Sequence, residues 1–223
     1  MDLFLQNHQY NYIVRQAKLV ISTIKTCSDN QVVETVKYTA LSKVLDACPG
    51  LSGEQRHLVE RLGELQTAEE LQVYMSKLLQ CTIKFPTLTE PQLKRLFPKV
   101  KKLRIPDLSD LEKHPLTYFT WTDSATNKKY LVYYRQPQSD KKSSGKLIGI
   151  EGQYTSTNKT GVCAFCKKPG EAAFFSAVAK TRSSHSPDYY RSVGQYICLD
   201  NKACNVQITE LDALESFIED ISK

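Results

Sequence analysis

The sequence has no run of about 18 uninterrupted apolar residues, which is the length that a membrane-spanning helix requires. Residues 1–7 carry neither a basic leader nor a long apolar stretch, so no secretory signal is indicated. Apolar residues make up 41% of the 223-residue chain, which suffices for a hydrophobic core. We therefore expect a soluble, globular, cytoplasmic protein with no membrane contact.

Motifs of the common enzyme chemistries are also missing. The sequence contains no G-x-S-x-G, no phosphate-binding loop and no G-x-G-x-x-G. The four histidines are scattered, and carboxylate pairs such as Glu69 with Glu70 fall at expected helix starts, where helix capping explains them. We predict that the protein is not an enzyme.

Disulfides are not indicated, because the seven cysteines are an odd number and four of them have metal-ligand spacing. Cys163 and Cys166 form a C-x2-C pair, followed by a Lys-Lys-Pro-Gly run that favours a tight turn. Cys198 and Cys204 form a C-x5-C pair. The two pairs predict one four-thiolate Zn²⁺ site in a protein of a reducing compartment.

The first part of the chain has the apolar spacing of amphipathic helices. Four segments carry this spacing: residues 10–24, 33–48, 52–65 and 67–78. Ser52 is placed to cap the third helix, and Thr67 with Glu70 forms a capping box at the start of the fourth. Because the connections are short, we predict an antiparallel four-helix bundle over residues 1–88.

Residues 89–114 are expected to connect the two halves of the chain. Thr89-Glu90-Pro91 is typical of a helix start, and residues 94–104 are the most basic run of the sequence. The net charge of +6 and the pI of about 8.8 permit an acidic partner or RNA and demonstrate neither. A charge run is more often a solvated face than a binding site.

Beyond residue 115, β-branched and aromatic residues replace the helical spacing, which indicates strands. Strands are predicted over residues 116–121, 130–135, 146–154, 172–179 and 194–197, and a closing helix over residues 205–222. Residues 180–191 are polar, basic and aromatic, so we expect an exposed loop there. Residues 115–223 are thus predicted to form a strand-rich domain.

The predicted fold class is α+β: an N-terminal antiparallel helical bundle, followed by a mixed α/β domain with a treble-clef zinc finger. Four thiolates leave no coordination position open for a water molecule, so a structural role is favoured over a catalytic one. A nucleobase deaminase would need His-x-Glu and Pro-Cys-x-x-Cys, whereas Val162 precedes Cys163 here. A redox-active C-x2-C pair stays open as a weaker alternative.

This combination resembles the FusB/FusC family of fusidic acid resistance proteins over nearly the whole chain. The resemblance is carried by the Cys163-Ala-Phe-Cys166 knuckle, by the Tyr196-Ile-Cys-Leu-Asp-Asn-Lys-Ala-Cys-Asn205 segment and by the closing helix, in combination with the bundle. It implies a monomer that binds the C-terminal domains of elongation factor G. It also implies that the protein promotes release of this factor from ribosomes on which fusidic acid has trapped it, with no reaction on the drug.

The resemblance further implies a binding surface of exposed aromatic and basic residues on the zinc-finger half. The matching positions are Phe165, Tyr190, Arg191 and Phe217. The alternative from another class is a zinc-finger protein that contacts ribosomal RNA or tRNA through residues 94–104 and 180–191.

Overall fold

The computed structural model describes residues 2–109, 111, 115–137, 145–182 and 190–222. The chain divides into two compact units, residues 1–83 and residues 84–223. Among the described residues, none of the helices combines the length and the apolar character that a membrane span requires.

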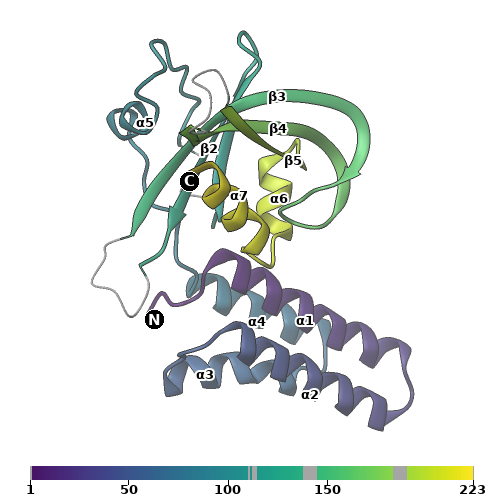
Figure 1. Cartoon of the computed structure of the whole chain (residues 1–223). Helices are drawn as coiled ribbons and strands as arrows, with labels where there is room; N and C mark the ends of the chain where they lie inside the picture. Colours follow the sequence, from purple (N-terminus) through teal and green to yellow (C-terminus); the bar gives the residue numbers. More distant parts are fainter. Residues whose placement is uncertain (1, 110, 112–114, 138–144, 183–189, 223) are drawn as a thin grey trace. The chain divides into compact units, whose positions relative to one another are not determined.

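Unit 1 is helical (Figure 1). Its elements are α1 (Asn7–Thr26), α2 (Asn30–Ala47), α3 (Gly53–Glu60), the 3-10 helix η1 (Arg61–Glu64) and α4 (Ala68–Gln80). The predicted helix starts are confirmed, because Ser52 and Thr67 each form a capping box with the residue three positions on. The apolar stripes of these helices meet in one core, in which Ile13, Val44 and Leu78 are fully buried.

The start of the chain closes this unit by pairing with the segment after α4. Leu5 forms a parallel bridge with Thr82, and the Ile83 N–H donates to the Leu5 carbonyl at 2.7 Å. Residues separated by nearly the whole length of unit 1 are therefore joined through the backbone.

Unit 2 contains one antiparallel sheet with the strand order β1-β2-β3-β4-β5. Its strands are β1 (Tyr118–Asp123), β2 (Lys128–Arg135), β3 (Lys146–Val162), β4 (Pro169–Arg182) and β5 (Tyr190–Cys198). Its helices are α5 (Glu90–Leu96), α6 (Asn201–Gln207) and α7 (Asp212–Ser222). The first two predicted strands are confirmed, and they pair as an antiparallel hairpin with Asn127 in the left-handed region at φ 51°.

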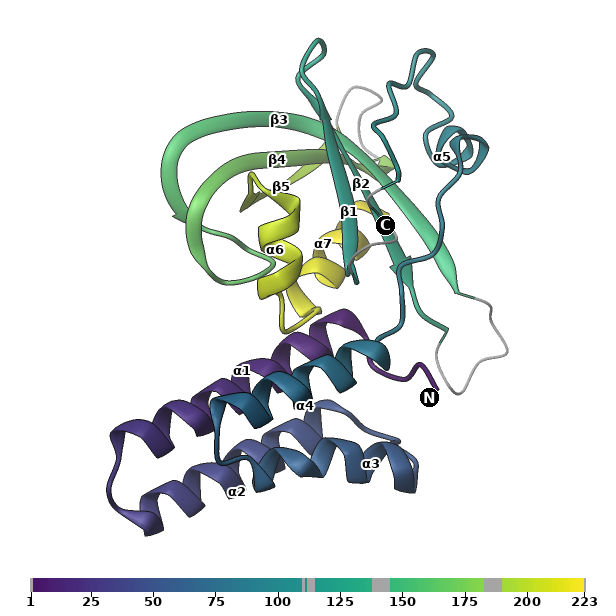
Figure 2. The same ribbon diagram turned by 180° about the vertical axis from the view of Figure 1, so that it is seen from behind.

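The two faces of the sheet carry different cores. Leu131 and Tyr133 of β2 belong to the core that includes the cysteines, α6 and α7, whereas Tyr130 and Val132 belong to the core under α5. Long curved strands β3 and β4 wrap around α6, and α5 lies on the other side of the sheet (Figures 1 and 2). This alternation follows from the two-residue period of a strand.

The fold class is confirmed, since helices are followed by an antiparallel sheet with a zinc-finger cysteine cluster. Residues 89–114, expected as a linker, instead contribute to a core of unit 2. Phe97, directly after α5, packs edge-on against Trp121 with ring centroids 5.7 Å apart. A side chain at Gly149 of β3 would lie 2.9 Å from the Leu96 Cβ, so a glycine at this position allows α5 to approach the sheet.

Two boundary predictions near the end of the chain are wrong. The single helix over residues 205–222 is in fact α6 and α7, because Ile208 leaves the helix in an extended conformation and inserts its side chain into the core. The expected loop over residues 180–191 begins and ends in strand, since β4 reaches Arg182 and β5 starts at Tyr190. Residues 183–189 of that prediction lie outside the described residues.

Candidate metal centre

The first two cysteines lie on the tight turn that joins β3 to β4. The Lys167 N–H donates to the Cys163 carbonyl at 2.9 Å, and the Cys163 N–H donates to the Lys168 carbonyl at 3.0 Å. Lys167 takes a left-handed φ of 58°, which closes the turn. The turn directs Cys163 and Cys166 toward the same point, as the C-x2-C spacing predicts.

The second pair comes from the end of β5 and from α6. Cys198 is the last residue of β5, and Cys204 is the fourth residue of α6. Asp200 caps this helix by accepting a hydrogen bond from the Lys202 N–H at 2.7 Å. The Ala164 N–H of the knuckle donates to the Tyr196 carbonyl at 2.7 Å, so the backbone also links the two halves of the site.

The four sulfurs have the spacing of a tetrahedral metal site. All four Sγ atoms lie within 4.8 Å of one another. The Sγ atoms of Cys163 and Cys204 are 3.7 Å apart, and those of Cys166 and Cys198 are 3.6 Å apart. Four sulfurs at a Zn–S distance of about 2.3 Å form a tetrahedron with edges of about 3.8 Å. The donor set therefore fits one structural Zn²⁺ ion and leaves no ligand position open.

The thiols of this cluster are strongly coupled. Hydrogen bonds from the neighbouring thiols, with that of Cys166 first, hold the pKa of Cys163 far below its ordinary value. The pKa of Cys204 is raised, chiefly because its thiol donates to Cys163. The Cys198 N–H also donates to the Cys163 sulfur at 3.3 Å. A bound cation would replace the thiol protons of this cluster, because it would stabilise all four cysteines as thiolates.

Asn205, which sequence reasoning missed, fixes the helix that carries Cys204. Its amide is buried, donates to the Tyr118 carbonyl at 2.9 Å and accepts from the Thr117 N–H at 2.7 Å. It also donates to the Asn201 carbonyl at 2.9 Å. The only feature of the sequence that could have indicated this role is the position of Asn205, a polar residue between Cys204 and the apolar residues that follow.

Two of the four expected partner-binding residues are in the core. Phe165 is 1% exposed, and its ring contacts those of Tyr118 and Phe217 at centroid distances of 5.5 and 5.8 Å. Phe217 is 2% exposed and also packs against Phe175. The prediction that these two rings are exposed to a partner is therefore wrong, because both rings fill the space between the knuckle, the sheet and α7.

The other two residues lie at the start of β5. Tyr190 is 66% exposed. Arg191 is exposed and forms an ion pair with Asp220 of α7 at 3.4 Å. Since side chains alternate along a strand, Tyr190 and Arg191 point to opposite faces of β5.

Further exposed apolar side chains share a face of the sheet with Tyr190. Phe174 and Tyr196 are paired in register across β4 and β5, with ring centroids 5.2 Å apart, and Val178 follows on β4. A side chain at Gly194 would lie 2.3 Å from the Phe174 ring, so glycine lets that ring cover β5. We call Phe174, Val178, Tyr190 and Tyr196 the outer aromatic face. The sequence of β4 shows no alternation of polar and apolar residues, because apolar side chains stand on both faces: Ala173, Phe175 and Ala177 are buried, whereas Phe174 and Val178 are exposed.

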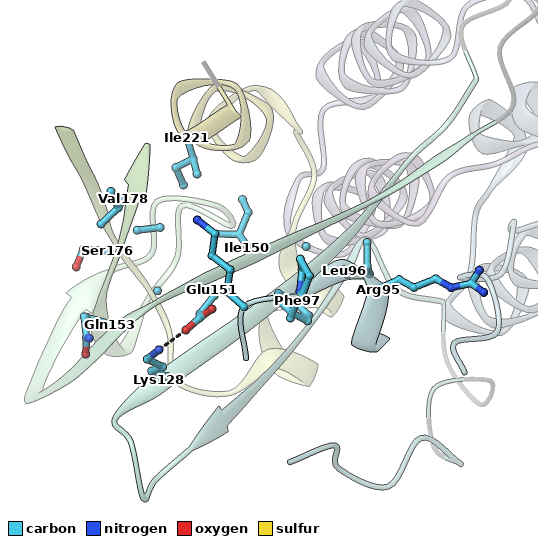
Figure 3. A pocket seen from close by; sticks show the side chains of 15 residues that line it. Arg95, Leu96, Phe97, Lys128, Ile150, Glu151, Gln153, Ser176, Val178 and Ile221 are labelled. Carbon is cyan, nitrogen blue, oxygen red and sulfur yellow. Dashed lines mark hydrogen bonds and ion pairs between the residues drawn. The ribbon is translucent and has the colours of Figure 1, made fainter. Parts of the chain in front are cut away.

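A cavity of about 580 Å³ in unit 2 lies beside this face (Figure 3). It is bounded by the end of α5, by β3 and β4, and by Ile221 of α7. Lys128 and Glu151, which line it, are ion-paired with each other. Among these lining residues, all of which are described, there is no histidine or cysteine, and Ser176 supplies the hydroxyl. The cavity therefore lacks a nucleophile and base arrangement.

Comparison with known proteins matches both parts of the chain. Residues 4–86 match the family model described as elongation factor G-binding protein, N-terminal. Residues 98–219 match the model of the FBP C-terminal treble-clef zinc finger. The solved structure of the fusidic acid resistance protein FusC superposes with a TM-score of 0.77 at 23% identity, covering 99% of this chain and 98% of that one. Comparison with curated proteins gives no match. The fold and the treble-clef zinc finger are thus confirmed.

Proposed function

The chain belongs to the FusB/FusC family of fusidic acid resistance proteins, and we propose that it binds elongation factor G. We further propose that it promotes the release of this factor from ribosomes on which fusidic acid has trapped it. The match of residues 4–86 to the elongation factor G-binding model is the observation that carries this proposal. The closed four-thiolate site supports a binding role without catalysis, since it has no position for a reacting water. Such a protein would act in the cytoplasm, as a monomer.

The binding surface that we propose is the edge of the sheet at β5, where Tyr190 lies on one face and Arg191 on the other, and it extends over the outer aromatic face. An exposed tyrosine offers a large rigid area at a small entropic cost, and arginine and aromatic side chains carry much of the energy at protein interfaces. The zinc site fixes β5 at Cys198, so the strand is ordered before it meets a partner. This preorganisation reduces the entropic cost of binding.

The proposal is tested by measuring the affinity of the purified, zinc-loaded chain for elongation factor G. Tyr190→Ala and Arg191→Ala should each weaken binding about tenfold or more, with unchanged zinc content. Val206→Ala is the control, because Val206 of α6 is 72% exposed and lies outside the proposed surface and outside residues 4–86. Wild-type affinity in both the Tyr190 and the Arg191 variant would place the interface elsewhere, and no binding of wild-type protein would refute the proposed function.

Release is tested on ribosomes stalled with elongation factor G and fusidic acid. Wild-type chain should increase the fraction of the factor that dissociates, and Tyr190→Ala should do so less. Binding without any gain in release would restrict the function to sequestration of the factor.

RNA binding is the competing function, and the exposed lysines of residues 94–102 favour it. Part of this charge is neutralised within the chain, since Lys94 pairs with Glu90 at 3.3 Å and Arg104 with Asp123 at 3.5 Å. Binding to RNA should weaken steeply with salt and need no protein factor. Elongation factor G binding through aromatic side chains should depend on salt less, so the two functions are separable in one titration.

A further inference from the structure

Lys129 of β2 is a lysine buried on the zinc side of the sheet. It is 3% exposed, and its side chain lies on the same face as Leu131 and Tyr133, which belong to the core around the cysteines. Its Nζ atom lies 5.0 Å from the centre of the Tyr154 ring. Among the residues that the structure describes, no carboxylate forms an ion pair with it.

A buried ammonium group without a carboxylate needs another source of negative charge. The Tyr154 ring supplies a weak cation–π attraction, which does not by itself replace the lost hydration of the ammonium. Burial lowers the pKa of Lys129 to about 8, whereas the negative charges of Cys204 and Cys198 act in the opposite direction. Lys129 and the cysteine cluster lie on the same side of the sheet, because Leu131, two residues along the same strand face, belongs to the core that contains Cys163, Cys166 and Cys204.

The cluster in turn needs positive charge once it holds zinc. Four thiolates around a divalent cation carry a net double negative charge, in a site where three of the four cysteines are buried. Lysines next to the ligands in sequence, such as Lys167 and Lys202, are exposed, so water screens their charges. A charge inside the protein is screened much less.

We propose that Lys129 is the internal counter-charge of the zinc centre. It is a positioning residue: it is not a metal ligand, but its charge raises the affinity of the four thiolates for the metal. The Lys129 ammonium favours the fully deprotonated cluster that zinc requires, and the bound zinc–thiolate group favours the buried ammonium. Each charge thereby compensates the burial of the other.

Zinc affinity of the full-length protein, measured by competition with a chromogenic chelator, tests this inference. Lys129→Met keeps the apolar stem and removes the charge, so zinc affinity should fall about 10- to 100-fold. Lys129→Arg keeps the charge and should retain most of the affinity. Lys202→Met is the matched control, because it removes an exposed lysine two positions from Cys204, and it should bind zinc as the wild type does.

Cobalt-substituted protein separates an electrostatic effect from damage to the fold. In Lys129→Met the ligand-field bands of tetrahedral four-thiolate cobalt should be unchanged in shape while the affinity falls. Unchanged zinc affinity in Lys129→Met would overturn the inference. So would an equal loss of affinity in Lys129→Arg or Lys202→Met, or a cobalt spectrum that shows altered coordination.

Discussion

The ring of Phe165, which lies between the ligands Cys163 and Cys166, should stabilise the zinc centre by packing. We expect Phe165→Ala to lower the free energy of unfolding of unit 2, because the substitution empties a site enclosed by Tyr118 and Phe217. Phe165→Ala thus destabilises the fold around the metal site, and it should lower the affinity for a partner only as a consequence of that destabilisation.

The magnitude follows from the burial of this side chain. Replacing a fully buried phenylalanine by alanine costs about 3–5 kcal/mol, which includes the lost transfer energy and the cavity that remains. The two aromatic contacts of Phe165 account for part of that sum, at about 0.5–1.5 kcal/mol each. A domain stable by about 5–15 kcal/mol would lose a large fraction of its stability. Phe165→Leu should lose less, since it keeps most of the apolar volume.

The chain contains a convenient reporter for this measurement. Trp121 is the single tryptophan, it lies in unit 2, and it is buried against Tyr130 with ring centroids 5.0 Å apart. Its fluorescence during a urea titration at saturating zinc therefore follows the unfolding of unit 2. With a typical slope for a small domain, the Phe165→Ala midpoint should fall by about 2 M urea.

A particular pair of results would refute this reasoning. If Phe165→Ala unfolded at the wild-type urea concentration and nevertheless failed to bind elongation factor G, the ring would be a contact residue and not part of the core. Tyr190→Ala provides the contrast, because loss of an exposed side chain should leave the unfolding midpoint nearly unchanged.

Three further predictions concern the stability of unit 2. Asn205→Leu should destabilise it by about 1–3 kcal/mol for each buried group left unpaired, such as the Thr117 N–H, and an unchanged Trp121 midpoint would contradict this. Chelation of zinc should abolish the fluorescence transition of unit 2 and spare the helical circular dichroism of unit 1, so equal stability of unit 2 with and without chelator would exclude a structural metal. Arg191→Ala should cost less than about 1 kcal/mol in the same urea titration, because its ion pair with Asp220 is exposed, and a larger loss would assign Arg191 to the fold.

The features that the sequence predicted correctly are those that short-range physics determines. Capping boxes at Ser52 and Thr67 satisfy backbone N–H groups within one turn, so three residues suffice to recognise them. The C-x2-C pair is equally local, since one tight turn brings both sulfurs to the metal. The starts of the third and fourth helices and the C-x2-C ligand pair were therefore predictable without knowledge of the tertiary fold.

The errors concern side chains whose surroundings come from distant parts of the chain. Phe165 is buried because Tyr118 of β1 and Phe217 of α7 pack against it, and no local pattern connects these three positions. Phe217 did carry a usable signal, because it lies on the apolar stripe of α7 with Leu214 and Ile218. That stripe favoured burial, whereas the family resemblance favoured exposure, and packing decided the outcome.

Burial of both phenylalanines changes what the zinc site contributes to the proposed interface. Because the knuckle exposes no aromatic ring to a partner, zinc would contribute by holding β5 in place. The Ala164 N–H of the knuckle donates to the Tyr196 carbonyl of β5, and the ligand Cys198 is the last residue of this strand. The Tyr190 and Tyr196 side chains project from β5 on the face turned away from the buried core. We therefore expect zinc removal to abolish elongation factor G binding although no cysteine touches the factor, and an apo protein that binds with full affinity would separate the interface from the metal.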